Sequence, residues 1–502
     1  MSGPKYAPLY GSDDDYDKDT PNMPRLTSND SASVIDASGK PVPLVLQATR
    51  SDSEGPPPSL QHTRDDDDRD TTAAGPFFRT HRRRWIGLAQ LVLLNIIVSW
   101  DWLTFAAVSS TSAKYFGVTE GSINWLSTGF LFAFVPVSPL VIWTLNKYGP
   151  KQSILVSSAL VLAGNWVRYA GTRSNYFGVV VFGQILIGFA QPFVLAAPTR
   201  YSNLWFSDKG RVSATAIASL ANPFGAALGQ LIGPFWASDE PSSIPHMVLY
   251  TSILSTVVTV PAPFIPNRPS TPSHLPSVGR EDGQAQGIWQ ATKDVCTNGA
   301  FWMILLPFSV YVGFFNATSS LLNQIMEPYG FSETEAGIAG ALLIVVGLIA
   351  SAIVSPLVDK TKRYLLTIQL LVPCIAIMYL AMIFMPDTRS VAGPYIVLAI
   401  LGATSFSLLP CALEYLVVVT YPVSPEISST VCWTGGQLLG AIFVLIMNAL
   451  RSDDWDGEPD GSMIRGMIFQ AVVAAIVVPC VFILGRKRFE GSHNPSVECH
   501  RG

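Results

Sequence analysis

The sequence predicts an all-α membrane protein with twelve transmembrane helices arranged as two six-helix halves. Charged residues make up only 14% of the 502 positions, whereas soluble domains carry about 25%. Beyond residue 84 the chain is a series of long apolar runs, and a weak repeat relates the first six runs to the last six. These three observations together predict a polytopic membrane protein built from two similar halves.

The apolar runs set the number of spanning helices. A bilayer core of about 30 Å requires about 20 apolar residues per helix. Twelve runs meet this length, and we expect helices over residues 85–108, 123–145, 152–170, 176–198, 211–236, 246–265, 300–322, 336–357, 364–384, 392–418, 427–449 and 463–485.

The polar segments divide the chain into parts. Residues 1–84 are rich in Asp, Ser and Pro, a composition that cannot bury enough apolar area to offset the entropy of ordering. We expect a disordered cytoplasmic tail there. The six-helix halves cover 85–265 and 299–486, a proline-containing cytoplasmic linker joins them over 266–298, and a second cytoplasmic tail covers 487–502.

The placement of Lys and Arg predicts that both termini lie in the cytoplasm. With this orientation the inner loops receive the basic clusters near 82–84, 147–151, 360–363 and 486–488, and an acidic loop over 453–460 lies outside. No signal-peptide pattern precedes the first spanning segment, so we expect that segment to direct insertion. The plasma membrane is the expected location, with the vacuolar membrane as the alternative.

An internal repeat supports the division into halves. A shift of 213 residues places Lys147 on Lys360, and a shift of 215 places Asn222 on Gln437. Each match is weak alone, but together they fall at equivalent loops and helices of the two halves. Parallel structural repeats of this kind are found in secondary transporters.

Two short charged loops are candidates for gating. They contain Asn146, Lys147 and Lys151 after the second run, and Asp359, Lys360 and Arg363 after the eighth. The pattern resembles the loop motif of the major facilitator transporters, in which ion pairs and helix dipoles can latch one half against the other. Asn146 departs from it, because the family usually has Asp there. The alternative is that these are ordinary positive-inside residues.

Polar side chains inside apolar helices are costly and are candidates for function. The residues concerned are Asp101, Arg168, Gln191, Asn316, Glu414 and Gln437. For Asp101 and Glu414 we expect substrate binding or proton or cation coupling, with a structural pair or an interhelical contact as the alternative. For Gln191 and Gln437 the alternative to substrate binding is a hydrogen bond between helices, which contributes about 0.6–2 kcal/mol.

Trp102 is an aromatic candidate, because an indole face in a cavity can hold a quaternary ammonium by cation–π attraction. The alternative is a packing or lipid-facing tryptophan. Glycines near 225–233 and 435–440 let helices approach closely, and we interpret them as packing residues.

Several function classes are not supported. The six cysteines show no metal-binding spacing. The chain also lacks a nucleotide-binding loop and a nucleophile elbow. We therefore expect no enzyme, no cofactor, no metal and no nucleic-acid partner. The expected partners are a small-molecule substrate and the lipid bilayer, and the expected state is a monomer.

The sequence resembles the feline leukaemia virus subgroup C receptor-related transporters over about residues 84–488. The segments that carry the resemblance are, in order, Trp102, 115–118 (YFGV), 124–127 (NWLS), 190–191 (AQ), 198–200 (PTR), 204–206 (LWF), 214–216 (ATA), 321–324 (LLNQ) and 420–422 (TYP).

The resemblance implies a major facilitator fold and a substrate such as choline or ethanolamine, with haem also proposed for the family. It implies a choline site in which Trp102, Gln191 and Gln437 match family positions. Asn316 falls where the choline carriers have tyrosine, so half of an aromatic clamp is missing. Asp101 replaces a glutamine, and an added carboxylate there could balance a primary amine or bind a proton.

Glu414 matches a glutamate of the family. The expected function is a uniporter or proton-coupled symporter of a small organic solute that works by alternating access around a midplane site. A drug or secondary-metabolite exporter on the same fold is the alternative. A receptor without transport activity would give no reason to keep polar residues in the membrane.

Overall fold

The computed structural model describes residues 83–206, 208–237, 240–266, 293, 295–420, 423, 425–451 and 459–484, and the backbone of 34–35 and 41–42. The chain divides into two compact units, 1–73 and 74–502. In the first, strands β1 (Val34–Ile35) and β2 (Pro41–Val42) pair antiparallel. Apart from these strands and residues 83–84, the expected tails lie outside the described residues, as does most of the expected linker.

The second unit is helical throughout its described part. Its first half contains α1 (Arg84–Leu103), η1 (Ala106–Val108), α2 (Ser109–Phe116), α3 (Glu120–Tyr148), α4 (Pro150–Arg173), α5 (Phe177–Trp205), α6 (Asp208–Ala237), η2 (Pro241–Ser243), α7 (Ile244–Thr259) and η3 (Ala262–Phe264). Its second half contains α9 (Gly299–Met326), η4 (Glu327–Tyr329), α10 (Glu333–Thr361), α11 (Tyr364–Met382), η5 (Pro386–Thr388), α12 (Ala392–Thr420), α13 (Pro425–Ala449), α14 (Ile464–Ile476) and α15 (Val478–Leu484).

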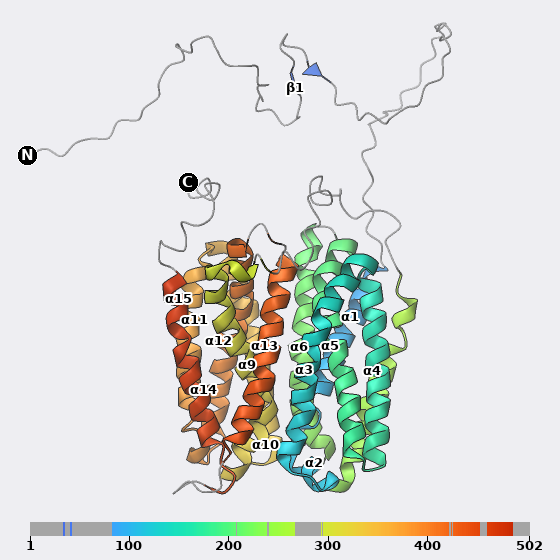
Figure 1. The fold of residues 1–502 in the computed structure, drawn as a ribbon, viewed down its shortest axis with the longest axis vertical. Helices are drawn as coiled ribbons and strands as arrows, with labels where there is room; N and C mark the ends of the chain where they lie inside the picture. The colour runs from blue at the N-terminus through green and yellow to red at the C-terminus, as the bar shows by residue number, and fades with distance from the viewer. Residues whose placement is uncertain are drawn as a thin grey trace, which may run out of the picture. The chain divides into compact units, whose positions relative to one another are not determined.

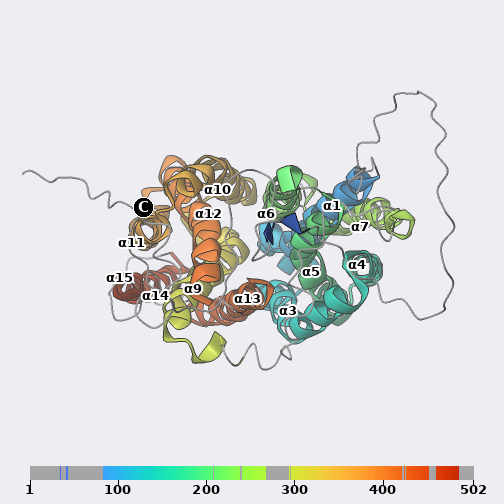
Figure 2. The ribbon, with the colours of Figure 1, turned by 90° about the horizontal axis from the view of Figure 1, so that it is seen from above.

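The helices form two bundles that lie side by side (Figures 1 and 2). Helices α1 and α3–α7 form one bundle, and α9–α15 form the other. The bundles meet along two seams, where α6 packs on α10 and α3 packs on α13. Helix α2 lies at the end of the molecule opposite α15 (Figure 1). In the expected orientation, with both termini in the cytoplasm, α2 lies at the outer end, and the terms outer and inner refer to this expected orientation.

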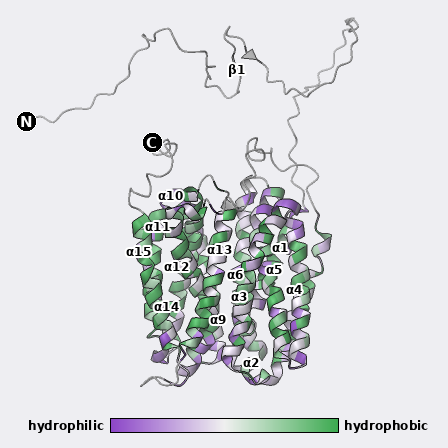
Figure 3. Ribbon diagram, viewed as in Figure 1, coloured by the Kyte–Doolittle hydropathy of each residue, from purple (hydrophilic) through white to green (hydrophobic). Residues whose placement is uncertain are grey.

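Eleven helical segments of the described chain are long and apolar enough to cross a membrane. Figure 3 shows apolar residues along the length of both bundles and more polar residues toward the ends. The 24-residue α4 is long enough for a further crossing, but the buried Asn165 and Arg168 lower its mean hydropathy. Each of the twelve expected runs is matched by a helix, several of which extend beyond the apolar run.

The extensions come from polar capping residues that a hydropathy pattern does not record. The Thr119 side chain accepts a hydrogen bond from the Ser122 backbone at the start of α3. At the start of α10, Ser332 and Glu335 form a capping box. Gly149 separates α3 from α4 with φ +83°, a backbone conformation that favours glycine.

The first expected helix, 85–108, differs from the structure. Helix α1 ends at Leu103, a turn follows, and the chain continues as η1 and then α2. The expectation of one continuous helix was wrong, because Ala106–Val108 after the turn is apolar like α1, and hydropathy therefore gives no sign of the break.

The glycines of α6 pack this helix on α1, as the sequence predicts. A Cβ at Gly225 would lie 2.0 Å from the Ile96 carbonyl oxygen, a backbone atom that cannot rotate away. We expect Gly225→Ala to destabilise the fold by about 1–3 kcal/mol, the usual cost of overpacking. Gly178→Ala is the control, because a Cβ there meets nothing within 4 Å. Thermal unfolding of the purified variants measures the difference, and equal melting temperatures would contradict the close approach.

Candidate functional site

Trp102 lies at the last turn of α1, where it is buried at 4% exposure. Its indole stacks on Phe130 of α3, with ring centroids 6.2 Å apart and planes 17° from parallel. It belongs to a hydrophobic cluster with Ala190 and Phe193 of α5, which lie one residue before and two residues after Gln191. The sequence-predicted aromatic residue is therefore inside the bundle and not on the lipid face.

Several buried polar side-chain atoms have no hydrogen-bond partner among the described residues, and two of them belong to the candidate substrate-binding residues. They are Trp102 Nε1 and Gln191 Oε1. Buried polar side-chain atoms are nearly always paired, so one unpaired donor and one unpaired acceptor on the packed helices α1 and α5 suit a polar ligand.

Asn316 and Gln437 contact each other directly. The Asn316 side-chain amide donates to Gln437 Oε1 at 3.1 Å, and both residues are buried. The contact joins α9 to α13, and the absence of a Cβ at Gly440 leaves room for Asn316. No hydrogen bond among the described residues joins this pair to Trp102 or Gln191.

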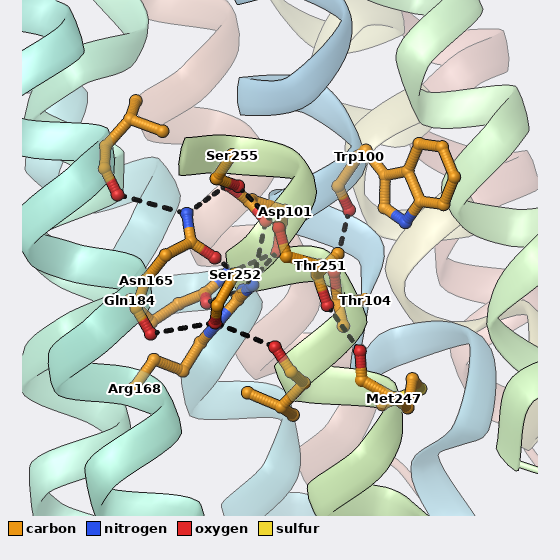
Figure 4. A network of polar contacts seen from close by, with 12 residues as sticks. Trp100, Asp101, Thr104, Asn165, Arg168, Gln184, Met247, Thr251, Ser252 and Ser255 are labelled. Atoms are coloured by element: carbon orange, nitrogen blue, oxygen red, sulfur yellow. Dashed lines mark hydrogen bonds and ion pairs between the residues drawn. The ribbon is translucent and has the colours of Figure 1, made fainter. Parts of the chain in front are cut away.

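Asp101 forms a fully buried ion pair with Arg168 of α4. Arg168 Nη2 lies 2.7 Å from Asp101 Oδ1, and both side chains have 0% exposure. Asn165 donates to Asp101 Oδ2 at 2.6 Å and accepts from Arg168 Nη2 at 2.7 Å. Gln184 of α5 accepts from Arg168 Nη1 at 2.9 Å. Figure 4 shows these side chains converging between α1, α4, α5 and α7.

This geometry favours the structural-pair alternative for Asp101. Its carboxylate is neutralised by a guanidinium, so it offers no free negative charge to a substrate amine.

Glu414 lies near the inner end of α12, where it is exposed. The pKa of Lys362 is raised mainly by the hydrogen bond from Lys362 Nζ to Tyr364 Oη, and the carboxylates of Asp359 and Glu414 act in the same direction. Glu414 therefore belongs with the second charged loop.

The candidate gating residues lie at the inner end, and their described contacts are local. Lys147 Nζ lies 5.0 Å from the centroid of the Trp143 ring on its own helix. Asp359 accepts a hydrogen bond from Tyr364 Oη at 2.8 Å. The other four side chains, Asn146, Lys151, Lys360 and Arg363, are exposed or half-buried. No described ion pair joins these loops across the two halves.

The outer end is where polar contacts join the halves. The buried Glu333, first residue of α10, accepts from Thr111 of α2 twice, from its backbone nitrogen at 3.0 Å and its hydroxyl at 2.8 Å. Asn323 of α9 donates to Ser109 of α2 at 3.0 Å and to Glu333 at 3.4 Å. A carboxylate of one half thus caps the first turn of a helix in the other, a favourable place for negative charge.

A second group of contacts lies beside the first. Asn124 and Gln324 exchange amide hydrogen bonds of 3.1 and 2.7 Å, and Asn124 also donates to Asn448 at 2.9 Å. Near the surface Arg451 forms an ion pair with Glu120. We call the contacts of Ser109, Thr111, Glu120, Asn124, Asn323, Gln324, Glu333, Asn448 and Arg451 the outer gate.

Sequence reasoning missed the role of these residues. Asn124, Asn323 and Gln324 were recognised only as marks of the family. A sequence signal was present for Asn124, an amide inside the expected helix 123–145, whereas Asn323 and Gln324 directly follow the expected helix 300–322 and lie inside α9 only in the structure. Glu333 stands beside the Ser332–Glu335 capping box, a pattern that indicates a helix start and gives no sign of a contact between the halves.

Comparisons with known proteins agree with this architecture. The family model described as Major Facilitator Superfamily matches residues 91–444. Solute carrier family 49 member A3 of Danio rerio is 32% identical over 384 residues, which cover 75% of this chain and 80% of that protein. The choline/ethanolamine transporter FLVCR1 of Mus musculus is 27% identical over 420 residues, covering 79% and 75%. The choline/ethanolamine transporter flvcr2a of Danio rerio is 27% identical over 386 residues, covering 74% and 81%.

Solved structures show the same fold. A bacterial homologue of the human lysosomal transporter Spinster superposes with a TM-score of 0.63 at 15% identity, covering 83% of this chain and all of that one. The nucleoside transporter NupG gives a TM-score of 0.60 at 11% identity, covering 80% and 100%.

The fold, the cross-half gate and the sequence matches agree. The chain belongs to the major facilitator superfamily of secondary transporters and, within it, to solute carrier family 49.

Proposed function

We propose that this transporter carries a small amino alcohol of the choline and ethanolamine type, with choline preferred, by uniport without proton coupling through Asp101. The observation that carries this proposal is that Trp102 Nε1 and Gln191 Oε1, on the packed helices α1 and α5, are buried and have no hydrogen-bond partner among the described residues. The Trp102 ring, which stacks on Phe130, supplies the aromatic face. A hydroxyl can accept from the indole and donate to the amide, while an aromatic face attracts the ammonium. Relatives named as choline/ethanolamine transporters support it.

The charge of the region supports the preference for choline. Among described residues, the buried charged side chains are Asp101, Arg168 and Glu333. The first two neutralise each other, and the third lies in the outer gate. A primary ammonium gives up strong hydration and needs a carboxylate or several acceptors, whereas a quaternary ammonium has no N–H group to satisfy.

Uptake by reconstituted proteoliposomes tests the proposal. We expect saturable uptake of radiolabelled choline, weaker uptake of ethanolamine, and less than about a twofold difference between pH 5.5 and 7.5. Uptake that is strongly stimulated at pH 5.5 in the unmodified protein, but not in the Asp101→Asn variant, would show that Asp101 couples transport to protons. No uptake of either amine, together with resistance to a toxic metabolite on overexpression, would favour the exporter.

Replacing Trp102 separates binding from packing. We expect Trp102→Leu to raise the KM for choline about tenfold or more, because cation–π attraction in a desolvated site contributes up to about 2 kcal/mol. The control is Trp100→Leu, since Trp100 is a buried neighbour that stacks on Trp236 at 5.6 Å. Concentration-dependent uptake measures both. Equal KM values in the two variants would remove Trp102 from the site.

A further inference from the structure

The break in α1 lies between the candidate substrate region and the outer gate. Helix α1 ends at Leu103, directly after Trp102, and α2 starts at Ser109. One side of the break therefore carries the indole, and the other carries the gate residues Ser109 and Thr111. A change in the geometry of the break would move both.

Side chains from other helices hold the carbonyl groups at the end of α1. Arg168 Nη1 and Gln184 Nε2 each donate to the Asp101 carbonyl oxygen at 3.0 Å. Thr104 donates to the Trp100 carbonyl oxygen at 3.1 Å. The last carbonyls of a helix lack intrahelical partners and attract cations, so Arg168 suits this end of α1.

Arg168 also contacts the break from a second side. Its guanidinium carbon lies 5.6 Å from the ring centroid of Phe105, a residue of the turn after α1. The Asp101 carboxylate fixes the same guanidinium at 2.7 Å. Successive helix residues point about 100° apart, so holding Asp101 toward α4 and α5 sets the direction of the Trp102 indole.

We propose that Arg168, Asp101 and Gln184 are positioning residues that hold the α1 break in the geometry that closes the outer gate and orients Trp102. The pair is then more than a buried structural contact, because it sets the equilibrium of the gate. The proposal rests on the transporter function, but the gate readout below does not depend on which solute is carried.

Gln184→Met tests the proposal, because it removes one donor to the Asp101 carbonyl and one acceptor of Arg168 Nη1 and leaves both charges of the ion pair in place. Gln90→Met is the matched control. Gln90 is also a buried glutamine whose amide donates to a main-chain carbonyl, that of Val258, but it lies eleven residues before Asp101, about 16 Å along α1. Gln90→Met removes one described buried hydrogen bond and Gln184→Met removes two, all within the same half.

The reporter is Ser112→Cys, labelled from outside by a membrane-impermeant maleimide in the full chain. Ser112 is in α2 with 0% exposure, and its hydroxyl has no described hydrogen bond to lose. We expect Gln184→Met to raise the labelling rate about tenfold and Gln90→Met to leave it within about twofold. Protein without Ser112→Cys gives the background from the native cysteines.

Thermal unfolding separates positioning from stability. If the two methionine variants lose similar stability and label Ser112→Cys at the same rate, the proposal is wrong. If Gln184→Met does not fold, Arg168→Lys takes its place, because it keeps the charge but not the forked guanidinium. Faster labelling of that variant supports the proposal, and unchanged labelling overturns it. Absence of choline uptake with the expected labelling pattern would contradict only the proposed substrate.

Discussion

Arg168→Met is expected to abolish most of the folded protein. The Asp101 carboxylate would remain at 0% exposure without its guanidinium partner, and removing one partner of a buried ion pair costs about 3–5 kcal/mol. Stability of single domains is only about 5–15 kcal/mol, so this is a large fraction. The measurement is the monodisperse yield after detergent extraction, together with the melting temperature of any protein recovered.

A double variant distinguishes the buried charge from the loss of a large side chain. Asp101→Asn with Arg168→Gln removes both charges and keeps amide groups that can bond Asn165 and Gln184, so we expect it to recover most of the yield. Arg173→Met is the surface control, because Arg173 is exposed at the end of the same helix. A double variant as unstable as Arg168→Met would show that the charge pair is not the cause.

Hydropathy was sufficient to predict the positions of the spanning helices, because a bilayer imposes a similar length and an apolar composition on every span. It could not show the break after Leu103, since Ala106–Val108 is as apolar as the helix before it. The break depends on donors from α4 and α5, 67 and 83 residues further along the chain. Such partners become visible only when the helices are packed together.

The candidate site shows the same limit. Asp101 and Arg168 could both be identified as costly polar residues, but their pairing needs the adjacency of α1 and α4, so a coupling role and a structural role stayed open. Asn316 and Gln437 were both identified, and the structure adds that they bond each other. Their mutual bond leaves each amide with fewer free groups for a solute than the sequence suggests.

The outer gate was missed for a related reason. Asn124 and Gln324 are 200 residues apart, and each alone is an amide in an apolar helix. Their role depends on which residues meet at the seam between the halves. The weak internal repeat predicts two halves but not the residue pairs that contact each other across the seam.

Glu333→Ala is expected to open the outer gate. Its carboxylate accepts three hydrogen bonds, two of them from Thr111 in the other half. Hydrogen bonds to charged groups contribute about 1.5–3 kcal/mol each, so losing those that cross the seam should shift the equilibrium toward the outward-open state about a hundredfold. The rate of Ser112→Cys labelling from outside measures the shift, and slower uptake should accompany it because the carrier returns less often.

Glu335→Ala provides the control within the same helical turn. Glu335 caps α10 through Ser332 and makes its described side-chain contacts there. Loss of a helix cap costs about 0.5–2 kcal/mol, but a contact inside one half is present in both conformations and cannot shift the equilibrium between them. Labelling should therefore rise in Glu333→Ala alone, although both variants lose a carboxylate from the first turn of α10. Equal labelling in the two variants would mean that the Glu333–Thr111 contact does not hold the gate closed.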